Sequence, residues 1–453
     1  MAVNKNQRKS KMLHPSRTIS LSFFLIIAVG TLLFMLPFMT RDGKGLPFMQ
    51  ALFTTTSSVC VTGLTLIDPA VTLTRYGQIL LLMLIEIGGI SMVTFATFFI
   101  FSIKKHSGFR SLRLAQEYTS IDTFSQVKPL VRTIIGTTVI CQVIGASLLC
   151  IRFVPKMGPK GIWVSLFTAV SAYCNAGFDL FGIENSFGSL SAYNGDALVM
   201  YTVMAMIVTG GLGFYVFYDL LTYRKNRHIS LHTKVVATFV VSLILVGAVC
   251  FFGFEHNNPG TIGTMTLFEK INASLFQSIT SRTAGFASVD IASLHDVTKI
   301  VMMFLMFIGA GTGSTGGGIK VTTYAVLVMT VLSVIQNKND TVIFGKRVDR
   351  RVVSKALSIA LLGILVIFIV CCVLVIETPD SNGINVLFEA VSAFSTTGLS
   401  AGITATAGNP GLCSIIAAMF IGRVGPICFI LALGSKESEK SREVLPEGRI
   451  MVG

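Results

Sequence analysis

Charged side chains are scarce in this sequence. Only 13% of its 453 residues are Asp, Glu, Lys or Arg, whereas 52% are hydrophobic and the mean hydropathy is +0.74. A water-soluble domain needs about 25% charged residues to cover its surface. The composition therefore excludes an ordinary soluble protein and indicates a surface that largely faces lipid. The apolar runs are continuous and do not alternate with polar residues, which predicts an all-α polytopic membrane protein and not a β-barrel.

Acidic residues and metal-binding patterns are also sparse. The net charge is +14, and most Lys and Arg residues fall in five clusters, at 1–18, 104–132, 223–234, 336–355 and 435–453. Such clusters mark cytoplasmic segments by the positive-inside rule, and intervening apolar runs argue against a nucleic-acid-binding face. The nine cysteines form no C-x-x-C pair, which favours buried reduced thiols over a disulfide frame or a metal site. No nucleophile–base pair or paired carboxylate suggests an enzyme.

Eight apolar runs are long enough to span a bilayer, which takes about 20 residues. They cover roughly 19–39, 77–103, 131–154, 197–222, 235–254, 297–334, 353–376 and 411–434. Within each successive pair lies a shorter amphiphilic stretch, at 47–62, 161–176, 267–284 and 384–397. Stretches of this length suit re-entrant helices that enter the membrane and return to the same side.

The four short stretches resemble one another. They read "ALFTTTSSVCVTGL", "SLFTAVSAYCNAGF", "SLFQSITSRTAGF" and "VLFEAVSAFSTTGL", and each ends in a glycine followed by an apolar residue. These glycines are Gly63, Gly177, Gly285 and Gly398. Even spacing of a matched motif indicates an internal repeat, here of a unit made of a helix, a re-entrant segment and a second helix.

Every basic cluster falls between units or at a terminus, so each unit is expected to start and end in the cytoplasm. The four units are then parallel and surround a central pore. The expected division is an N-terminal cytoplasmic tail, four pore repeats and a C-terminal cytoplasmic tail, at 1–18, 19–103, 104–222, 223–334, 335–434 and 435–453.

Irregular backbone at membrane depth occurs where it lines a water-filled cavity or is buried in protein. Glycine lets the backbone turn its carbonyls toward an axis, and rings of carbonyls replace the hydration shell of a monovalent cation. The alternative is that the four loops only allow close helix packing. Asp68, Asp179 and Asp290 follow their glycines and either attract cations to the outer mouth or are ordinary loop acids.

The stretch "GAGTGSTGGGIK", Gly309 to Lys320, contains G-x-G-x-x-G and raises the alternative of a membrane enzyme that binds a nucleotide. A P-loop requires Lys directly after Gly and then Ser or Thr, but here Ile319 separates Gly318 from Lys320 and Val321 follows. The stretch interrupts an apolar run of 38 residues, so it is expected to break a helix near mid-membrane and act as a gate, or as a passive kink.

Glu86, Arg282 and Arg423 are charged residues inside the expected membrane segments, where charges are costly and usually functional. Arg423 is expected to form a gating barrier below the loops, or else an ion pair with a carboxylate such as Glu86. Glu86 and Arg282 favour a supporting role in networks that hold the helices and loops.

The chain resembles the Trk/Ktr/HKT superfamily of potassium transporters, in particular the membrane subunit of the bacterial Ktr system. The resemblance rests on the glycine stretch and on the motifs "SVCVTGL", "AYCNAGFDLFG", "TSRTAGF", "FSTTGLSAGIT" and "IGRVGP". The resemblance implies a potassium-selectivity filter, with potassium at backbone carbonyls, made of Val59, Cys60, Val61, Thr62, Gly63, Tyr173, Cys174, Asn175, Ala176, Gly177, Ser281, Arg282, Thr283, Ala284, Gly285, Phe394, Ser395, Thr396, Thr397 and Gly398. It implies a gate made of Gly309, Ala310, Gly311, Thr312, Gly313, Ser314, Thr315, Gly316, Gly317, Gly318, Lys320 and Arg423.

The same resemblance implies potassium uptake across a bacterial plasma membrane, with potassium as substrate and no cofactor in this chain. In this family a serine in place of the first filter glycine accompanies sodium permeability, so four glycines favour potassium. A sodium or non-selective cation transporter on the same fold is the alternative, and sodium coupling of potassium uptake is open. The implied partners are a cytoplasmic ring of nucleotide-binding regulatory subunits and a second copy of the chain in a homodimer.

Overall fold

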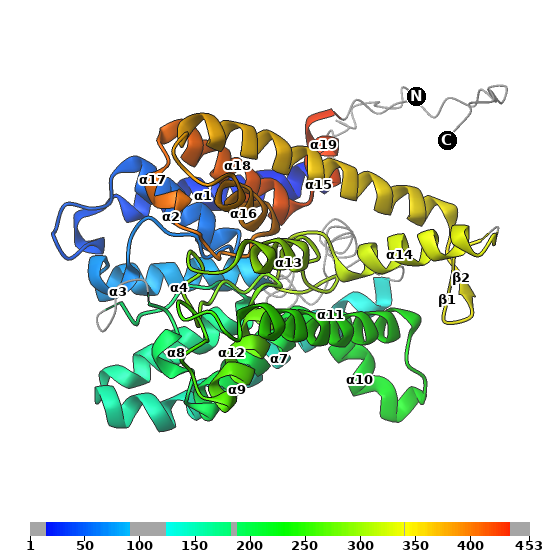
Figure 1. Cartoon of the computed structure of the whole chain (residues 1–453), viewed down its shortest axis with the longest axis horizontal. Coiled ribbons are helices and arrows are strands. Elements are labelled where there is room, and N and C mark those ends of the chain that lie inside the picture. The colour runs from blue at the N-terminus through cyan, green and yellow to red at the C-terminus, as the bar shows by residue number, and fades with distance from the viewer. Residues whose placement is uncertain (1–14, 91–123, 183–187, 339, 435–453) are drawn as a thin grey trace, which may run out of the picture.

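The computed structural model describes residues 15–90, 124–182, 188–338 and 340–434 (Figure 1). Within these residues the chain is helical except for loops and one small hairpin, in which β1 (Val342–Ile343) pairs antiparallel with β2 (Lys346–Arg347). The hairpin was not predicted from the sequence, but the expected helical class otherwise describes the fold.

The principal helices form four groups, each with a first helix, a short helix and a second helix. They are α1 (Pro15–Phe34), α2 (Phe48–Val59) and α4 (Arg75–Ile90); α7 (Phe124–Met157), α8 (Lys160–Cys174) and α9 (Ala197–Leu212) with α10 (Phe214–Asn226); α11 (Leu231–Glu255), α12 (Leu267–Thr280) and α13 (Asp296–Phe307) with α14 (Val321–Ile335); and α15 (Arg350–Glu377), α16 (Gly383–Ser395) and α18 (Asn409–Val424) with α19 (Pro426–Gly434). Connecting turns contain η1 (Pro37–Met39), α3 (Pro69–Thr72), η2 (Ser191–Tyr193) and α17 (Ile403–Thr406).

Several helices begin at side chains that cap free backbone N–H groups. Thr266 and Glu269 form a capping box at the start of α12, Asn382 caps α16, and Asp349 caps α15. Short polar side chains at these positions accept hydrogen bonds that the first helical turn cannot make internally. The caps of α12 and α16 fix where these two short helices start, and hence where the loops at their C-terminal ends lie.

The membrane-length helices are fewer than the eight expected runs. Among the described residues, α1, α7, α11 and α15 are long and apolar enough to cross a bilayer, and the bent pair α9 and α10 makes a fifth if counted as one span. The expected span at 197–222 is not one continuous helix, because the chain bends by 90° at Gly213, whose φ is +98°. Gly425 (φ +92°) separates α18 from α19 in a similar way, and α4 is described only to Ile90, so 91–103 of that run lie outside the described residues.

The four groups pack in a closed order. The second helix of each group contacts the short helix of the next: α4 contacts α8, α9 contacts α12, α13 contacts α16, and α18 contacts α2. Figure 1 shows the first and fourth groups side by side, above the second and third. The arrangement places the C-terminal ends of all four short helices in the middle of the molecule.

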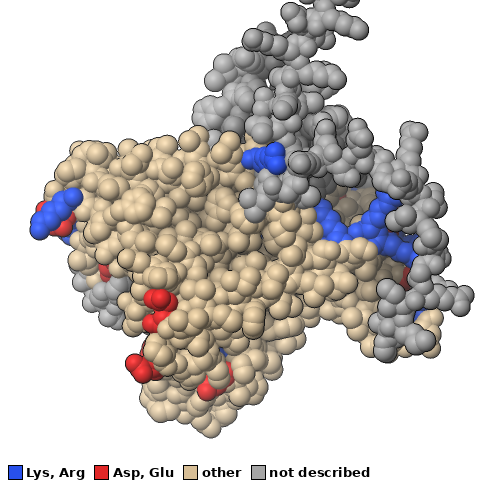
Figure 2. Space-filling model, turned by 90° about the horizontal axis from the view of Figure 1, so that it is seen from above, with Lys and Arg blue, Asp and Glu red and all other residues tan. Residues whose placement is uncertain are grey.

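The outer surface is strongly apolar. Phe24, Leu245 and Phe368 on the long helices are 63%, 58% and 64% exposed. Figure 2 shows a wide face almost free of charged side chains, with Lys and Arg gathered mainly toward its right-hand end. A soluble monomer rarely exposes such a continuous apolar surface, so this surface suits contact with lipid.

Candidate ion pathway

Four glycines form a closed ring at the centre of the molecule. A Cβ added to Gly63 would meet the carbonyl oxygen of Ala176, and one on Gly177 would meet that of Ala284, each at less than 3.0 Å. In the same way, Gly285 lies against the carbonyl of Thr397, and Gly398 against that of Thr62. Each ring glycine therefore abuts the carbonyl that precedes the next ring glycine, and no side chain fits between them.

The backbone around the ring has an unusual and repeated conformation. The ring glycines have φ values of +95°, +69°, +82° and +91° in chain order. The residue two positions before each is also left-handed: Val61 at +56°, Asn175 at +59°, Thr283 at +69° and Thr396 at +51°. Positive φ is rare for β-branched residues such as Val and Thr and persists only where the surroundings impose it. The repeated conformation makes the four loops the candidate functional site of the molecule.

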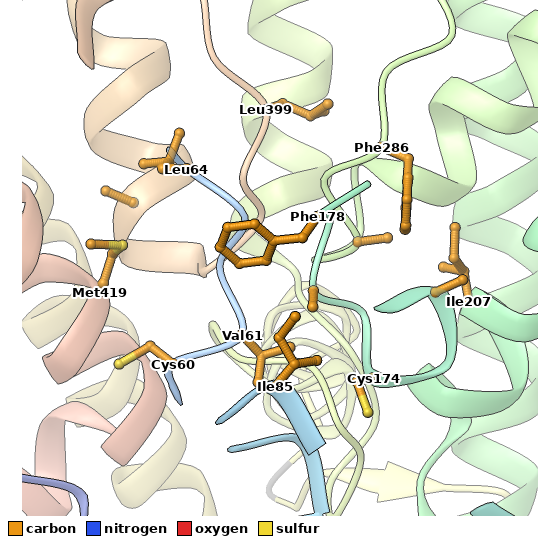
Figure 3. Packing of buried hydrophobic residues seen from close by; sticks show 14 of the residues in the cluster. Cys60, Val61, Leu64, Ile85, Cys174, Phe178, Ile207, Phe286, Leu399 and Met419 are labelled. Carbon is orange, nitrogen blue, oxygen red and sulfur yellow. The ribbon is translucent and has the colours of Figure 1, made fainter. Parts of the chain in front are cut away.

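The short helices and an apolar layer hold the loops in place. Ser57 Oγ and Ser392 Oγ each accept a hydrogen bond of 3.1 Å from the amide of the glycine six residues later, Gly63 and Gly398. The residues that directly follow the ring glycines, Leu64, Phe178, Phe286 and Leu399, are each at most 2% exposed. Figure 3 shows these side chains packed around the converging loops.

A vestibule of about 380 Å³ opens on one side of the ring. It is lined by all four ring glycines and by residues that follow them, including Asp68, Asp179 and Asp290. Asp68 also caps α3 through the amide of Ala70, and Asp290 accepts a bond from the amide of Ala292. Burial, followed by the nearby charge of Asp68, raises the pKa of Asp179 to about 6. Asp68 and Asp290 thus stabilise their local turns through hydrogen bonds, and all three acidic residues also line the vestibule.

The twenty predicted filter residues form four runs of five, at the ends of the short helices and in the loops that follow them, and their side chains differ in orientation and contacts. Figure 3 shows Cys60 and Cys174 turned away from the centre of the ring, and both are fully buried. Arg282 is 6% exposed, and its Nε has no hydrogen-bond partner among the described residues. Backbone carbonyls, and not these side chains, line the ring.

The glycine-rich loop, Gly309 to Lys320, lies on the opposite side of the ring from the vestibule. A Cβ on Gly316 would clash with Thr283 Oγ1, and one on Gly317 with Thr396 Oγ1. Thr315 Oγ1 donates to the carbonyl of Tyr173 at 3.2 Å. The loop thus contacts three of the four filter segments. It separates α13 from α14, so the helix is interrupted where the sequence predicted.

The loop is attached to its surroundings, and three of its backbone amides are paired. The amides of Gly309, Gly311 and Thr315 donate to the carbonyls of Ile319, Gly211 and Gly210 at 2.8, 2.8 and 3.3 Å. A phosphate-binding loop presents such amides to its ligand. The amides of Gly309, Gly311 and Thr315 are engaged and cannot also bind a phosphate.

Two cations hold the carbonyls of this loop. Arg423 donates from Nη1 to the carbonyl of Thr315 and from Nη2 to the carbonyls of Gly88 and Gly89 in α4. Lys320 Nζ donates to the carbonyls of Gly316 and Gly317 at 2.7 and 3.5 Å. Arg423 therefore ties the loop to the first group and to its own helix.

Glu86 does not pair with Arg423. Its Oε2 accepts a hydrogen bond from Gln142 Nε2 at 2.8 Å and lies 3.3 Å from Cys174 Sγ. This connection joins α4, α7 and the second filter segment, which agrees with the supporting role expected for Glu86.

Sequence reasoning missed a second set of glycines. Gly88, Gly210 and Gly422 lie on second helices, and a Cβ on each would clash with the carbonyls of Val59, Tyr173 and Phe394 respectively. These carbonyls belong to the ends of α2, α8 and α16. The sequence signal that they share is a glycine in "EIGG", "VTGG" and "FIGR". This glycine can be recognised only when the second helices of the repeats are compared with one another.

Comparison with known proteins identifies relatives over nearly the whole chain. The family model described as "TrkH: Cation transport protein" matches residues 3–444. The chain is 36% identical to Ktr system potassium uptake protein B of Bacillus subtilis over 440 residues, covering 97% of each chain. It is 38% identical to potassium/sodium uptake protein NtpJ of Enterococcus hirae over 452 residues, covering 99% of each.

A solved structure resembles the fold. The crystal structure of the potassium transporter TrkH from Vibrio parahaemolyticus matches with a TM-score of 0.72 at 16% identity, over 94% of this chain and 86% of that one. At this identity the likeness concerns the fold alone.

Proposed function

Because this chain belongs to the TrkH family of cation transport proteins, we propose that it carries potassium into the cell through the ring of Gly63, Gly177, Gly285 and Gly398. One observation supports this most directly: each ring glycine abuts the carbonyl before the next, in an order that closes on itself. Four close backbone segments can surround a dehydrated monovalent cation with carbonyl oxygens. The C-terminal dipole ends of the four short helices add negative potential at the same place.

The proposed membrane arrangement has four parallel repeats, at 19–103, 104–222, 223–334 and 335–434. The first and second helices of each repeat span the bilayer, and α2, α8, α12 and α16 are re-entrant from the outer side. The tails at 1–18 and 435–453 are then cytoplasmic in a bacterial plasma membrane, as the basic clusters favour. A reporter enzyme that is active only outside the cytoplasm, fused to either terminus, is expected to be inactive; activity at one terminus would contradict this orientation.

The proposed gate is the glycine-rich loop together with Lys320 and Arg423. It lies across the inner side of the ring and blocks the path between ring and cytoplasm. Movement of α13 and α14 would withdraw it. Deleting Gly311–Gly316 is expected to raise potassium uptake and lower its dependence on any regulatory partner; lower uptake by correctly folded protein would count against a gate.

The proposed partner is a cytoplasmic ring of nucleotide-binding subunits, and the proposed assembly is a homodimer. The Bacillus subtilis relative is named as a component of a Ktr system, and this chain supplies basic cytoplasmic segments for docking. Co-purification of the chain with such a subunit, with release or rate change on exchanging ATP for ADP, would support the proposal. Uptake that is unaffected by the subunit at every nucleotide concentration would contradict it.

The defining experiment is potassium uptake in a bacterial strain that lacks its own potassium uptake systems. Expression of this chain is expected to restore growth at low potassium. Rubidium uptake is expected to saturate with rubidium concentration and to be inhibited by added potassium. Omitting sodium from the medium shows whether uptake is sodium-dependent. Failure to restore growth with the protein present in the membrane, both alone and with the regulatory subunit co-expressed, would refute potassium uptake.

A second candidate is transport of sodium as well as potassium. The Enterococcus hirae relative is named a potassium/sodium uptake protein. Four ring glycines favour potassium by family resemblance, so sodium is expected to compete only weakly. Sodium uptake of similar rate and affinity in the same strain would favour this candidate.

A further inference from the structure

The helix α10 leaves the bundle at a sharp angle. It follows α9 directly, and the axes of the two helices differ by 90° at Gly213. Figure 1 shows α10 at the end of the molecule where α14 and the hairpin lie, opposite the end that carries α3 and α17. Because residues of α3 and α17 line the vestibule, α10 lies on the side away from the vestibule and runs across the direction of α9.

The length of α9 places α10 at the inner boundary of the bilayer. The 16 residues of α9 rise about 24 Å, whereas the hydrocarbon core is about 30 Å thick. The helix begins after Asp196, which caps it and pairs with Arg152 at 3.1 Å, so this charged pair marks the outer boundary. Gly213 then lies close to the inner headgroups, and the 90° bend directs α10 along them.

The two faces of α10 have different surroundings. Phe214 and Val216 are 4% and 3% exposed and pack in apolar clusters with residues of α7 and α11 respectively. On the outward side, Leu220, Leu221 and Tyr223 are 50%, 66% and 45% exposed, and we call these three residues the α10 outer face. An in-plane helix at a membrane surface buries such a face at the boundary of headgroups and acyl chains.

The far end of α10 is basic. After Tyr223 the sequence reads "RKNR", which adds three positive charges and ends at the exposed Arg227. The one acidic residue of the helix, Asp219, accepts a hydrogen bond from the amide of Ser230 at 2.9 Å and so stabilises the turn into α11. Basic residues beside an apolar interfacial face suit the anionic headgroups of the cytoplasmic leaflet.

The near end of α10 holds the glycine-rich loop. The amide of Phe214 donates to the carbonyl of Gly313 at 2.9 Å, and a Cβ on Gly213 would lie 2.6 Å from the carbonyl of Thr312. These contacts lie on the first turn of α10 and at the bend before it. A displacement of the helix therefore moves the support of the loop.

We propose that α10 is an interfacial helix whose outer face lies among the phospholipids of the inner leaflet, with its basic end on their anionic headgroups, and that this seating keeps the glycine-rich loop on its support. A soluble partner would need the α10 outer face to stand clear of the bilayer, which the depth of Gly213 disfavours. The inference rests on the proposed orientation and gate, and it makes basal uptake depend on the charge of the surrounding lipid.

A tryptophan reporter tests where the α10 outer face lies. The chain has one tryptophan, so Leu221→Trp in a Trp163→Phe background gives a single signal from α10. The purified chain is placed in phospholipid vesicles whose acyl chains carry bromine, which quenches tryptophan fluorescence on contact. About half of the emission or more is expected to be lost, because an interfacial helix places this face among acyl chains. Phe344→Trp in the hairpin, where Phe344 is 55% exposed, is the matched control and is expected to stay unquenched.

Rubidium uptake tests the link to the loop. Initial uptake by the purified chain, without a regulatory subunit, is compared in phosphatidylcholine vesicles and in vesicles that also contain about 30% phosphatidylglycerol. Neutral lipid is expected to raise basal uptake about threefold, because the basic end of α10 loses its anionic partner. Leu220→Ser with Leu221→Ser is expected to show the higher rate in both lipids, and Arg227→Gln a smaller rise. Leu245→Ser with Val246→Ser on α11, where both side chains are 58% exposed, is the matched control and is expected to keep the wild-type values.

An unquenched Leu221→Trp reporter would overturn the inference, and its protection from a soluble quencher only after addition of the regulatory subunit would assign the face to that subunit. Equal basal uptake by the wild-type chain in the two lipids would also overturn it, as would a double serine variant that still responds to lipid charge. The quenching measurement needs no transport. Absence of rubidium uptake in every vesicle would therefore refute the proposed function separately.

Discussion

The ring glycines are single residues on which ion passage should depend. A Cβ on Gly398 would strike the carbonyl of Thr62, and its φ of +91° disfavours any other residue. Either that carbonyl turns away from the ring or the whole fourth loop shifts. The consequence is a change in ion coordination and not merely in stability.

Gly398→Ala is therefore expected to reduce potassium uptake at least about tenfold and to weaken discrimination against sodium, because one of the ring carbonyls is displaced. Gly43→Ala is the matched control: Gly43 also has positive φ (+68°), but a Cβ there meets nothing within 4 Å. Similar loss in both variants would mean that backbone strain, and not the ring contact, is responsible.

Arg423 is a second residue whose removal gives a directional prediction. Its guanidinium is the described link from Thr315 in the glycine-rich loop to Gly88 and Gly89 in α4. Arg423→Ala removes charge-assisted bonds of about 1.5–3 kcal/mol each and frees the loop. We expect faster basal potassium uptake and a smaller response to the regulatory subunit; unchanged uptake in both respects would exclude a gating role.

Asp179 should make uptake depend on pH. Its pKa of about 6 is raised above the ordinary value by burial and by Asp68, so the carboxylate is charged above pH 6 and neutral below it. At limiting potassium, uptake is expected to fall as external pH drops through 6, because the vestibule attracts cations less strongly. Asp179→Asn is expected to show the low rate at all pH values, and a persistent inflection near pH 6 would assign the effect elsewhere.

At the scale of elements, the bend between α9 and α10 holds the glycine-rich loop. Phe214 N donates to the carbonyl of Gly313 at 2.9 Å, and Gly211 accepts from the amide of Gly311. A Cβ on Gly213 would lie 2.6 Å from the carbonyl of Thr312. The second group therefore holds the loop that interrupts the third.

Gly213→Ala is expected to push the loop off its support and raise basal uptake. Gly425→Ala provides the comparison, since Gly425 separates α18 from α19 with a similar φ of +92° but a Cβ there meets nothing within 4 Å. Uptake and protein amount in the membrane are measured for both. Equal effects in the two variants would show that the bends, and not contact with the loop, control uptake.

At the scale of the molecule, side chains near the outer rim link successive groups. Gln78 in α4 accepts a bond from Trp163 Nε1 in α8, and Tyr201 in α9 donates to Asn272 in α12. Lys299 in α13, which is 3% exposed, donates to Asn385 Oδ1 in α16 and to the carbonyl of Ala292, both at 2.9 Å. These bonds join the groups around the ring.

Lys299→Met is expected to lower the thermal midpoint of the purified protein in detergent, because the carbonyl of Ala292 and Asn385 Oδ1 both lose a hydrogen bond from a buried donor. Exposed Lys234→Met is the control for loss of a positive charge. A midpoint equal to that of the control would show that the rim bonds contribute little to holding the groups together.

The sequence by itself determined the helical membrane class, the repeated loop motif and the family. The match to the TrkH family model confirms the family and confirms that the chain is a transport protein and not an enzyme. These follow from composition and local patterns, which need no knowledge of distant contacts. Only the tertiary structure decided that Glu86 bonds to Gln142 and Cys174, that Arg423 holds Thr315, and that α9 bends at Gly213. Such partners lie far apart in the chain, and several apolar helices offer each polar group more than one neighbour. The choice depends on how the four groups close around the ring.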